Sequence, residues 1–328
     1  MNIVERTAAF CLQENLFDDG DTLLVACSGG PDSLALLDIL AALMPSHHLR
    51  LIVCYVHHGI RKTADAEVKR VQQEALQRQC EFVCCYSDVP TIAAQRHQSL
   101  EAAGRDERYR LLRQEAKIWH AQAIAVAHHQ NDQAETVLLH VLRGSGLSGL
   151  KGMQPKSGDI IRPLLDLTRQ EIDEYIEKRQ LCPCHDETND SDVFTRNRIR
   201  LQLLPYLKQY NPAIIADLNR LALLAQADDD FLQHEAKRLY TALAVHQASD
   251  VCMDKKALLA QPVAMQRRLI RLLCQDVTGT MQNISFHYVE TVRQLAGKGA
   301  GKQFQTGTWL AYTTRTALCI KPCLYRRR

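Results

Sequence analysis

The sequence predicts an α/β fold: a doubly wound, mostly parallel five-stranded sheet, followed by a second domain that is mainly helical. Two observations predict it. Up to about residue 165, apolar runs of strand length alternate with helical runs, which is the pattern of a parallel sheet with crossover helices. From Asn211-Pro212 onward, long helical runs follow one another without alternating strands. We therefore expect domains at residues 1–210 and 211–328, the second ending in a small β-hairpin.

The expected elements follow from the hydrophobic pattern. Five apolar runs are the expected strands: Thr22–Cys27, Arg50–Val56, Glu81–Tyr86, Ala121–Ala127 and Asp159–Leu165. The expected helices of the first domain are Asp32–Leu43, Ala64–Gln79, Leu100–Trp119, Asp132–Leu142 and Thr168–Arg179. The second domain is expected to hold helices Ile214–Leu243, Lys255–Cys274 and Ser285–Leu295, and a hairpin within Gly297–Pro322. Because ligands of such sheets bind at the carboxyl ends of the strands, the residues after each strand are the candidates for a site.

The turn after the first strand reads Ser28-Gly29-Gly30-Pro31-Asp32-Ser33 and leads into a helix. A strand that turns through glycines into a helix directs several backbone N–H groups, and the positive end of the helix dipole, at one spot. The turn therefore suits a phosphate group, with Ser28 and Ser33 as hydroxyl donors. Asp32 cannot bind an anion directly, so we expect it to face a metal ion that bridges phosphates. The alternative is an ordinary glycine-rich turn with a serine cap.

Polar side chains also follow the fourth strand, in the stretch Ala127-His128-His129-Gln130-Asn131-Asp132-Gln133-Ala134-Glu135-Thr136. Asn131 is a suitable N-cap, and Asp132 and Glu135 would then share a face in the first turn of the helix. Two carboxylates on one face would hold a cation such as the ammonium group of an amino acid. The alternative is simple helix-start chemistry, since the helix dipole favours acidic residues there.

Two groups of arginines are candidates for contact with phosphates. Arg105 and Arg108 share one face of the helix Leu100–Trp119, where they either form surface ion pairs or approach the phosphate groups of a ligand. A later helix opens with three arginines that suit a phosphate backbone and equally suit a solvated helix face. These are Arg196, Arg198 and Arg200.

Charge and cysteine content limit the class of protein. The net charge is +3; residues 1–210 hold 24 Lys and Arg against 28 Asp and Glu, or −4, and residues 211–328 hold 16 against 9, or +7. The basic second part, which ends Tyr325-Arg326-Arg327-Arg328, is as consistent with binding a polyanion as with a solvated tail. No apolar run is long enough to span a bilayer, and the N-terminus lacks a signal-peptide pattern. We expect the 12 cysteines, among which no C-x-x-C occurs, to be reduced in a cytoplasmic protein.

Several motifs occur in a fixed order along the chain. They are Ser28–Ser33, His57-His58-Gly59-Ile60-Arg61, Glu101–Tyr109, Ala-His-His-x-x-Asp-Gln-Ala-Glu-Thr, Arg162-Pro163-Leu164-Leu165 and Arg196-Asn197-x-Ile199-Arg200. Over residues 20–210 this set resembles the tRNA(Ile)-lysidine synthetases, a family of PP-loop N-type ATP pyrophosphatases with a doubly wound, Rossmann-like sheet. The helical part and the hairpin with Gly301-Lys302-Gln303 also resemble the tRNA-recognition region of that family.

The resemblance implies a ligase that uses ATP and Mg²⁺, with a CAU-anticodon tRNA(Ile) and free L-lysine as partners and no membrane. ATP would adenylate the C2 oxygen of the wobble cytidine, at position 34, and the lysine ε-amine would then displace AMP to leave lysidine. A homodimer is left open. The residues that the resemblance assigns are Ser28, Gly29, Gly30, Pro31, Asp32, Ser33, His57 and Arg105 to ATP, Asp32 to Mg²⁺, Asp32, Arg108 and His128 to catalysis, Asp132 and Glu135 to lysine, and Arg196, Arg198 and Arg200 to tRNA.

The chain departs from the family pattern at two points. Asn131 stands where the family usually has a second aspartate, which removes one charge. The chain also ends at Arg328, whereas longer members continue into another C-terminal domain. One alternative is a PP-loop tRNA thiolase for cytidine or uridine, which needs a sulfur relay or iron–sulfur ligands. The other is a non-catalytic nucleic-acid-binding protein, against which the intact Asp32, Asp132 and Glu135 argue.

Overall fold

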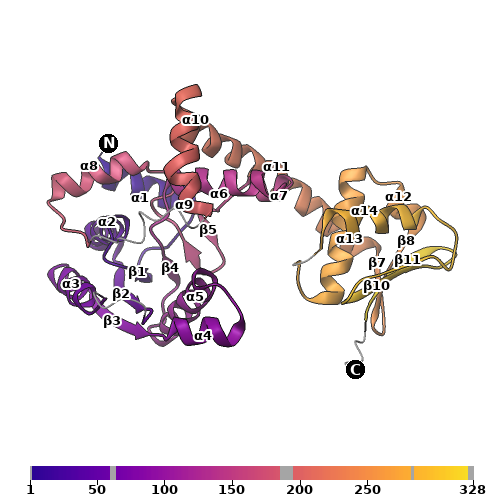
Figure 1. Cartoon of the computed structure of the whole chain (residues 1–328), viewed down its shortest axis with the longest axis horizontal. Coiled ribbons are helices and arrows are strands. Elements are labelled where there is room, and N and C mark those ends of the chain that lie inside the picture. The colour runs from indigo at the N-terminus through magenta and orange to yellow at the C-terminus, as the bar shows by residue number, and fades with distance from the viewer. Residues whose placement is uncertain (1, 60–63, 185–194, 282–283, 324–328) are drawn as a thin grey trace. The chain divides into compact units, whose positions relative to one another are not determined.

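The computed structural model describes residues 2–59, 64–184, 195–281 and 284–323. Ile60 and Arg61 of the second motif, and the basic end Tyr325–Arg328, lie outside the described residues. The chain divides into two compact units, Met1–Ala225 and Gln226–Arg328 (Figure 1). Helix α11 (Ile214–Leu243) contributes residues to both units.

The N-terminal unit is built on a six-stranded sheet with the order β3-β2-β1-β4-β6-β5 (Figure 1). Its strands are β1 (Thr22–Ala26), β2 (Arg50–His57), β3 (Glu81–Tyr86), β4 (Ala123–Ala125), β5 (Lys156–Ser157) and β6 (Ile160–Ile161). All neighbours pair in parallel except β5, which is antiparallel to β6. The predicted doubly wound, mostly parallel sheet is confirmed, and its strand order reverses between β1 and β4. Ligands bind at such a point in open α/β sheets.

Apolar side chains of alternate residues fill a core on each face of this sheet. Leu23 and Val25 of β1 pack on one face, where α2 buries Leu36 and Leu40, and Leu24 packs on the other. The helices of the unit before α11 are α1 (Ile3–Gln13), α2 (Pro31–His47), α3 (Ala64–Gln77), α4 (Val89–Arg96), α5 (Leu100–Ile118), α6 (Gln130–Leu142), α7 (Leu147–Leu150), α8 (Arg169–Arg179), α9 (Thr195–Arg198), a π-helix (Ile199–Leu203) and α10 (Leu204–Tyr210).

The last part of the sheet differs from the sequence prediction. The single expected strand Asp159–Leu165 is only the two-residue β6, which pairs with the equally short β5. Pro163 has no backbone N–H to donate to a neighbouring strand, and the chain turns after Arg162, whose carbonyl accepts from Leu165 N at 3.1 Å. The sheet therefore has six strands instead of five.

The N-terminal unit extends to residue 225, beyond the domain boundary expected near 210. Leu218 and Ala222 of α11 are buried against Ala134 and Val137 of α6 and against Leu204 of α10. The first turns of α11 are thus part of the same core as the site helix α6, and hydrophobic burial fixes them there.

The C-terminal unit contains more strand than the sequence predicted. Its five-stranded antiparallel sheet has the order β7-β8-β11-β10-β9, and buried residues of α13 and α14 share one core with it. A small hairpin was expected at the end of the chain, and the strands that precede the helices were not. Expected helix Lys255–Cys274 is divided in two at Pro262, which precedes the second helix. The elements are β7 (Ala244–Gln247), β8 (Asp250–Asp254), α12 (Lys255–Leu259), α13 (Val263–Thr278), α14 (Phe286–Ala296), β9 (Gln303–Gln305), β10 (Trp309–Thr313) and β11 (Ala317–Pro322).

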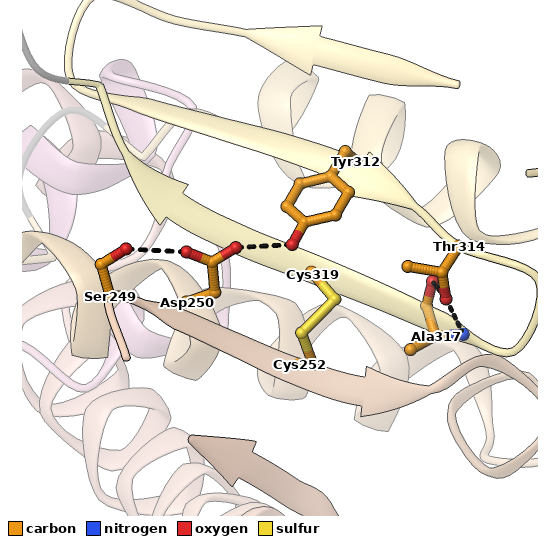
Figure 2. Close-up of a disulfide and its surroundings, with 7 residues drawn as sticks. All are labelled: Ser249, Asp250, Cys252, Tyr312, Thr314, Ala317 and Cys319. Carbon is orange, nitrogen blue, oxygen red and sulfur yellow. Dashed lines mark hydrogen bonds between the residues drawn. A yellow bond between two sulfur atoms is a disulfide. The ribbon is translucent and has the colours of Figure 1, made fainter. Parts of the chain in front are cut away.

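A disulfide joins Cys252 of β8 to Cys319 of β11 (Figure 2). The two residues are direct partners in the antiparallel ladder, with Cα atoms 4.0 Å apart. Beside the bond, Tyr312 of β10 donates its hydroxyl proton to Asp250 at 2.5 Å. The expectation that the cysteines are all reduced is therefore wrong for this pair, because register alone brings two thiols together that lie 67 residues apart in the sequence. The other ten cysteines are free.

Among the described residues, no helix combines the length and the apolar character that crossing a membrane requires.

Candidate active site

The turn between β1 and α2 is the expected phosphate site, and its shape depends on glycine. Gly29 has φ +82°, and a Cβ atom there would come within 3.1 Å of Val71 Cγ2, so a larger residue would be strained. Gly30 caps α2 without a side-chain hydrogen bond, and Pro31 occupies the first turn. The free backbone N–H groups of that turn are available to an anion.

The two serines of the turn lie beside it. Ser33 Oγ donates a hydrogen bond to Gly30 O at 2.9 Å and lies 3.3 Å from Ser28 Oγ. Ser33 is buried, whereas Ser28 is closer to the surface of the turn. The hydroxyls thus brace the turn from within, and rotation of Ser28 would let it donate to a ligand.

Asp32 lies in the first turn of α2 and faces other charged groups. Both of its carboxylate oxygens accept from Arg169 Nη1, at 2.8 and 3.0 Å, and Asp32 Oδ1 lies 3.7 Å from His129 Nε2. Burial raises the pKa of Asp32, and nearby His129 and Arg169 oppose that shift without cancelling it. Arg169 is the residue that holds Asp32 in place.

His129, rather than the expected Asn131, caps α6. Its Nδ1 accepts from Asn131 N at 3.2 Å, and Asp132 Oδ2 accepts from His129 N at 3.1 Å to complete a capping box. The other nitrogen, Nε2, lies between Asp32 and Asp132, 3.4 Å from Asp132 Oδ2. Asn131 Oδ1 instead accepts from the backbone of Arg169 at 3.1 Å. An aspartate could make that bond as well, so asparagine preserves the local structure.

The two carboxylates proposed for lysine are bound to two of the three arginines proposed for tRNA. Glu135 accepts from Arg196 Nε at 2.8 Å and from Arg200 Nε at 2.6 Å, and Asp132 Oδ1 accepts from both arginines at 3.1 Å. Burial raises the pKa of Asp132, but His129 and Arg196 outweigh it and the net pKa is lowered. Arg198 lies apart from them and lines a separate groove of about 560 Å³ with Leu142 and Tyr206.

A second group of side chains near the same strand ends is cationic. Burial, together with nearby Arg162, Arg196 and Arg105, lowers the pKa of His128 to about 3 although Asp132 opposes this shift. Desolvation by the surrounding protein also lowers the pKa of the Arg108 guanidinium, and the positive charges of Arg105 and Arg196 lower it further. His128 is therefore a neutral imidazole at pH 7.

His57 ends β2 and holds the turn that follows it. Its Nδ1 accepts from Gly59 N at 3.1 Å, its ring packs on Tyr86 with centroids 5.1 Å apart, and Nε2 lies 3.7 Å from Asp65 Oδ1. These contacts place an imidazole at the strand edge, beside the strand that leads into the phosphate turn.

A cavity of about 200 Å³ opens next to the paired carboxylates. His129, Glu135, Arg169 and Arg200 contribute its charged and polar wall, and Lys208 reaches it from α10. Pockets for drug-sized ligands have volumes of about 300–1,000 Å³, so this cavity is of the size for a single amino acid rather than a nucleotide.

The structure brings most of the predicted site residues to one edge of the sheet, and it adds three that the sequence prediction did not assign. No pattern in the sequence marked Arg169 as a site residue, apart from its position at the start of a helix. His129 and Arg162 were both inside quoted motifs, and each follows a strand that ends at this edge. A systematic reading of every polar residue after a strand would have found these two.

A doubly wound sheet whose first strand turns through glycines into a helix, with acidic and cationic groups at the same strand ends, defines a nucleotide-binding α/β protein. A family model described as a PP-loop domain matches residues 2–207. The chain belongs to the PP-loop family and, within it, to the family of the tRNA(Ile)-lysidine synthases, as the similarity to its members establishes.

Three such members illustrate that similarity. The tRNA(Ile)-lysidine synthase of Caldanaerobacter subterraneus subsp. tengcongensis is 34% identical over 298 residues, which cover 90% of this chain and 64% of that protein. The enzyme of Geobacter sulfurreducens is 37% identical over 299 residues, 89% of this chain and 63% of that one. The enzyme of Clostridium acetobutylicum is 32% identical over 313 residues, which cover 94% of this chain and 68% of that protein. The chain thus spans a little under two thirds of the length of the first of these relatives.

Among solved structures, the U34-tRNA thiolase NcsA from Methanococcus maripaludis, determined with its [4Fe-4S] cluster, is similar with a TM-score of 0.57. The sequences are 17% identical, and the match covers 68% of this chain and 78% of that chain. At that identity the likeness shows the fold alone.

Proposed function

We propose that this chain carries the catalytic part of a tRNA(Ile)-lysidine synthase. ATP adenylates the C2 oxygen of the wobble cytidine in a CAU-anticodon tRNA(Ile) and releases pyrophosphate. The ε-amine of free L-lysine then attacks C2, AMP leaves with the oxygen, and a C–N bond has formed. The proposal places the reaction in the cytoplasm and keeps a homodimer as an expectation.

One observation carries the proposal: an anion-binding turn and a cation-binding pair of carboxylates share one sheet edge. The turn at Gly29 and Gly30 presents backbone N–H groups, which suits the pyrophosphate end of ATP. Asp132 and Glu135 form a pair of carboxylates that already binds cations, the guanidinium groups of Arg196 and Arg200, and a lysine ammonium would have to displace at least one of them to bind there. Adjacent sites for a phosphate and for an amine are what adenylation followed by amine attack requires.

The remaining roles follow from position. Arg108 and His128 are the groups proposed to contact the reacting phosphate and the cytidine, and Arg105 and His57 to contact ATP. A neutral His128 donates or accepts a hydrogen bond without adding charge. Positioning of the amine and electrostatic stabilisation of the leaving phosphate supply the rate enhancement.

Asp32 is the residue proposed to hold Mg²⁺, as a single carboxylate that would bind the ion together with phosphates of ATP. Among the described residues no group of three or more His, Cys, Asp or Glu side chains could hold a metal ion. Mg²⁺ is commonly bound by one or two carboxylates together with substrate phosphates, and Asp32 beside the turn matches that arrangement. When bound there, the ion would neutralise charge on the phosphates, and Arg169 would have to give up one carboxylate oxygen.

Recognition of tRNA is proposed for residues 211–328 together with Arg196, Arg198 and Arg200. The second unit is the more basic part of the sequence, which favours binding of a polyanion. The thiolase alternative needs a sulfur relay or iron–sulfur ligands, and the sequence contains no C-x-x-C.

The proposal is tested by incubating the chain with ATP, Mg²⁺, labelled lysine and a CAU-anticodon tRNA(Ile) transcript. Label is expected on the wobble nucleoside, with one AMP and one pyrophosphate for each lysine. A transcript whose anticodon is GAU is the matched control and should take up no label. Pyrophosphate release without transfer of lysine would contradict the proposal. Incorporation of sulfur into the tRNA when sulfide is supplied in place of lysine would also contradict it.

A further inference from the structure

Arg162 is a buried arginine that the proposed mechanism does not use. It directly follows β6, and only 8% of its surface is exposed. Its Nη1 donates to Gln154 O at 2.6 Å, while its Nε is buried and has no hydrogen-bond partner. Within the described residues no carboxylate pairs with it. A buried cation without a counterion is costly, and such a group is usually completed by a ligand or a paired acid.

The surroundings of Arg162 are also cationic. Arg105 of α5 lies near it and, after the larger effect of burial, contributes to a lowered pKa of the Arg162 guanidinium. Arg105 packs over Tyr109, 5.2 Å from the ring centroid, and has no carboxylate partner among the described residues. His128 is close enough to both arginines for them to depress its own pKa. Of the nearby arginines, Arg196 is the one whose charge is matched, by Asp132 and Glu135.

A second unsatisfied group lies on the adjacent strand end. His128 Nδ1 is buried and has no hydrogen-bond partner. β4 and β6 pair in parallel, and Val126 N donates to Ile161 O at 3.0 Å, so His128 and Arg162 both emerge at the carboxyl edge. Arg162 Nε can only donate and so requires an acceptor oxygen, and His128 Nδ1, which follows the neighbouring strand, can donate to the same acceptor in the tautomer that carries its proton.

The place of Arg162 separates this position from the turn after β1. β6 is two strands from β1, which at the normal strand spacing is about 10 Å. An anion bound at Arg162 is therefore distinct from one seated on the amides that follow Ser28. A guanidinium fork with free donors is the side chain best suited to phosphate oxygens.

We propose that Arg162 binds a phosphate ester of the reacting pair, at the carboxyl ends of β4 and β6, with His128 as its neutral neighbour. This inference rests on the proposed function. The phosphate is either the α-phosphate of ATP, which becomes the AMP of the adenylate, or a phosphodiester of the tRNA next to the reacting nucleotide. Both present the same oxygens, and experiment distinguishes them.

The test uses the full chain with Arg162→Met and, as matched control, Arg113→Met. Arg113 is on α5, and its guanidinium is satisfied by Asp159 at 2.7 and 3.2 Å, so its removal should change nothing. For each variant we would measure binding of ATP alone, binding of the tRNA alone at several salt concentrations, and pyrophosphate release with both. Thermal unfolding reports whether each variant is folded.

We expect Arg162→Met to release pyrophosphate at least about ten-fold more slowly than Arg113→Met. If the α-phosphate is the ligand, the Kd of ATP rises and tRNA binding is unchanged. If the tRNA backbone is the ligand, tRNA binds more weakly and the slope of its salt dependence falls by about one, with ATP binding unchanged. Binding and release within about two-fold of the Arg113→Met values would overturn the inference.

If Arg162→Met fails to fold, the same measurements are made on Arg162→Lys, and the same ten-fold and two-fold limits apply. Lysine keeps the charge and can still donate to Gln154 O, but it lacks the planar set of donors by which a guanidinium group binds two phosphate oxygens. The binding measurements need no lysine transfer. A wild-type chain that binds ATP and tRNA but transfers no lysine would therefore refute the proposed function without removing the test of Arg162.

Discussion

Replacing Glu135 with glutamine should separate lysine binding from adenylation. Glu135 is 1% exposed and accepts hydrogen bonds from Arg196 Nε, Arg200 Nε and Arg200 Nη2 at 2.8, 2.6 and 3.2 Å. Glutamine keeps the shape and one acceptor oxygen but removes the negative charge. The two arginines retain Asp132 as their acid, at 3.1 Å from each.

The magnitude follows from the charge that is lost. Opposite unit charges 4 Å apart attract by about 4 kcal/mol at an effective dielectric constant of 20. Because Asp132 remains and attracts the ammonium too, only part of the attraction is lost, and the KM for lysine should rise by about 100-fold or somewhat more. Disrupting a buried ion pair should also lower the free energy of unfolding, by about 3 kcal/mol.

The assay measures the KM for lysine in lysidine formation and, separately, pyrophosphate release with ATP and tRNA at saturating concentrations. Release should change by less than about three-fold, because the turn at Gly29 is untouched. Glu107→Gln is the matched control. Glu107 has a side chain 2% exposed between Arg96 and Arg110, at 3.0 and 2.8 Å, so the control should lose similar stability with no change in lysine KM.

Two results would refute the reasoning. Equal loss of pyrophosphate release and lysine transfer in Glu135→Gln would mean that the residue supports the whole site and does not select lysine. A comparable rise in lysine KM in Glu107→Gln would mean that loss of stability, wherever it arises, is enough to produce the effect.

Three further predictions concern the turn, its acid and the scaffold. Asp32→Ala should reduce tRNA-dependent pyrophosphate release to background because no carboxylate then faces the phosphates, whereas Asp173→Ala, which removes the other acid bound to Arg169, should stay active in the same assay. Gly29→Ala should raise the Kd of ATP by about ten-fold in a direct titration, since the new Cβ approaches Val71 and a residue with φ +82° costs about 1–2 kcal/mol. Asp38 is buried between helices. Burial raises its pKa, but hydrogen bonds from three partners outweigh this effect, and the net pKa is lowered from 3.8. The stability that the Asp38 carboxylate gives to the folded protein is therefore complete above pH 3.8 and is lost as the pH falls below that value. Urea midpoints should show that Asp38→Asn costs about 3 kcal/mol at pH 7 and progressively less as the pH is lowered below 3.8. A cost that does not fall at any pH at which the protein still folds would contradict the assignment.

The features that sequence analysis predicted are those with local causes. The turn at Gly29 follows from the order of strand, glycines and helix within one short stretch, and the predicted strand–turn–helix is confirmed. The five predicted strand positions each contain a strand because short apolar runs between helical runs are typical of the buried strands of a parallel sheet. The roles given to Asp32, Asp132 and Glu135 remain proposals, but their common location follows from the parallel sheet.

The features that it missed depend on contacts distant in sequence. The hydrogen bond from Arg169 to Asp32 joins positions 137 residues apart, and no local sequence pattern predicts it. Strand β8 buries a short apolar segment, and its partner β11 lies beyond two long helices. Strands β5 and β6 have only two residues each, which is too short for any periodicity to be visible.

The cross-link between Cys252 and Cys319 also shapes how the C-terminal unit responds to damage. Every residue from Met253 to Leu318 lies within the covalent ring that this bond closes. A protease that cuts once anywhere inside the ring would leave both fragments attached, and the last strand would stay in its sheet until a reductant opened the bond. Two cuts, or one cut and a thiol, are needed to take the unit apart.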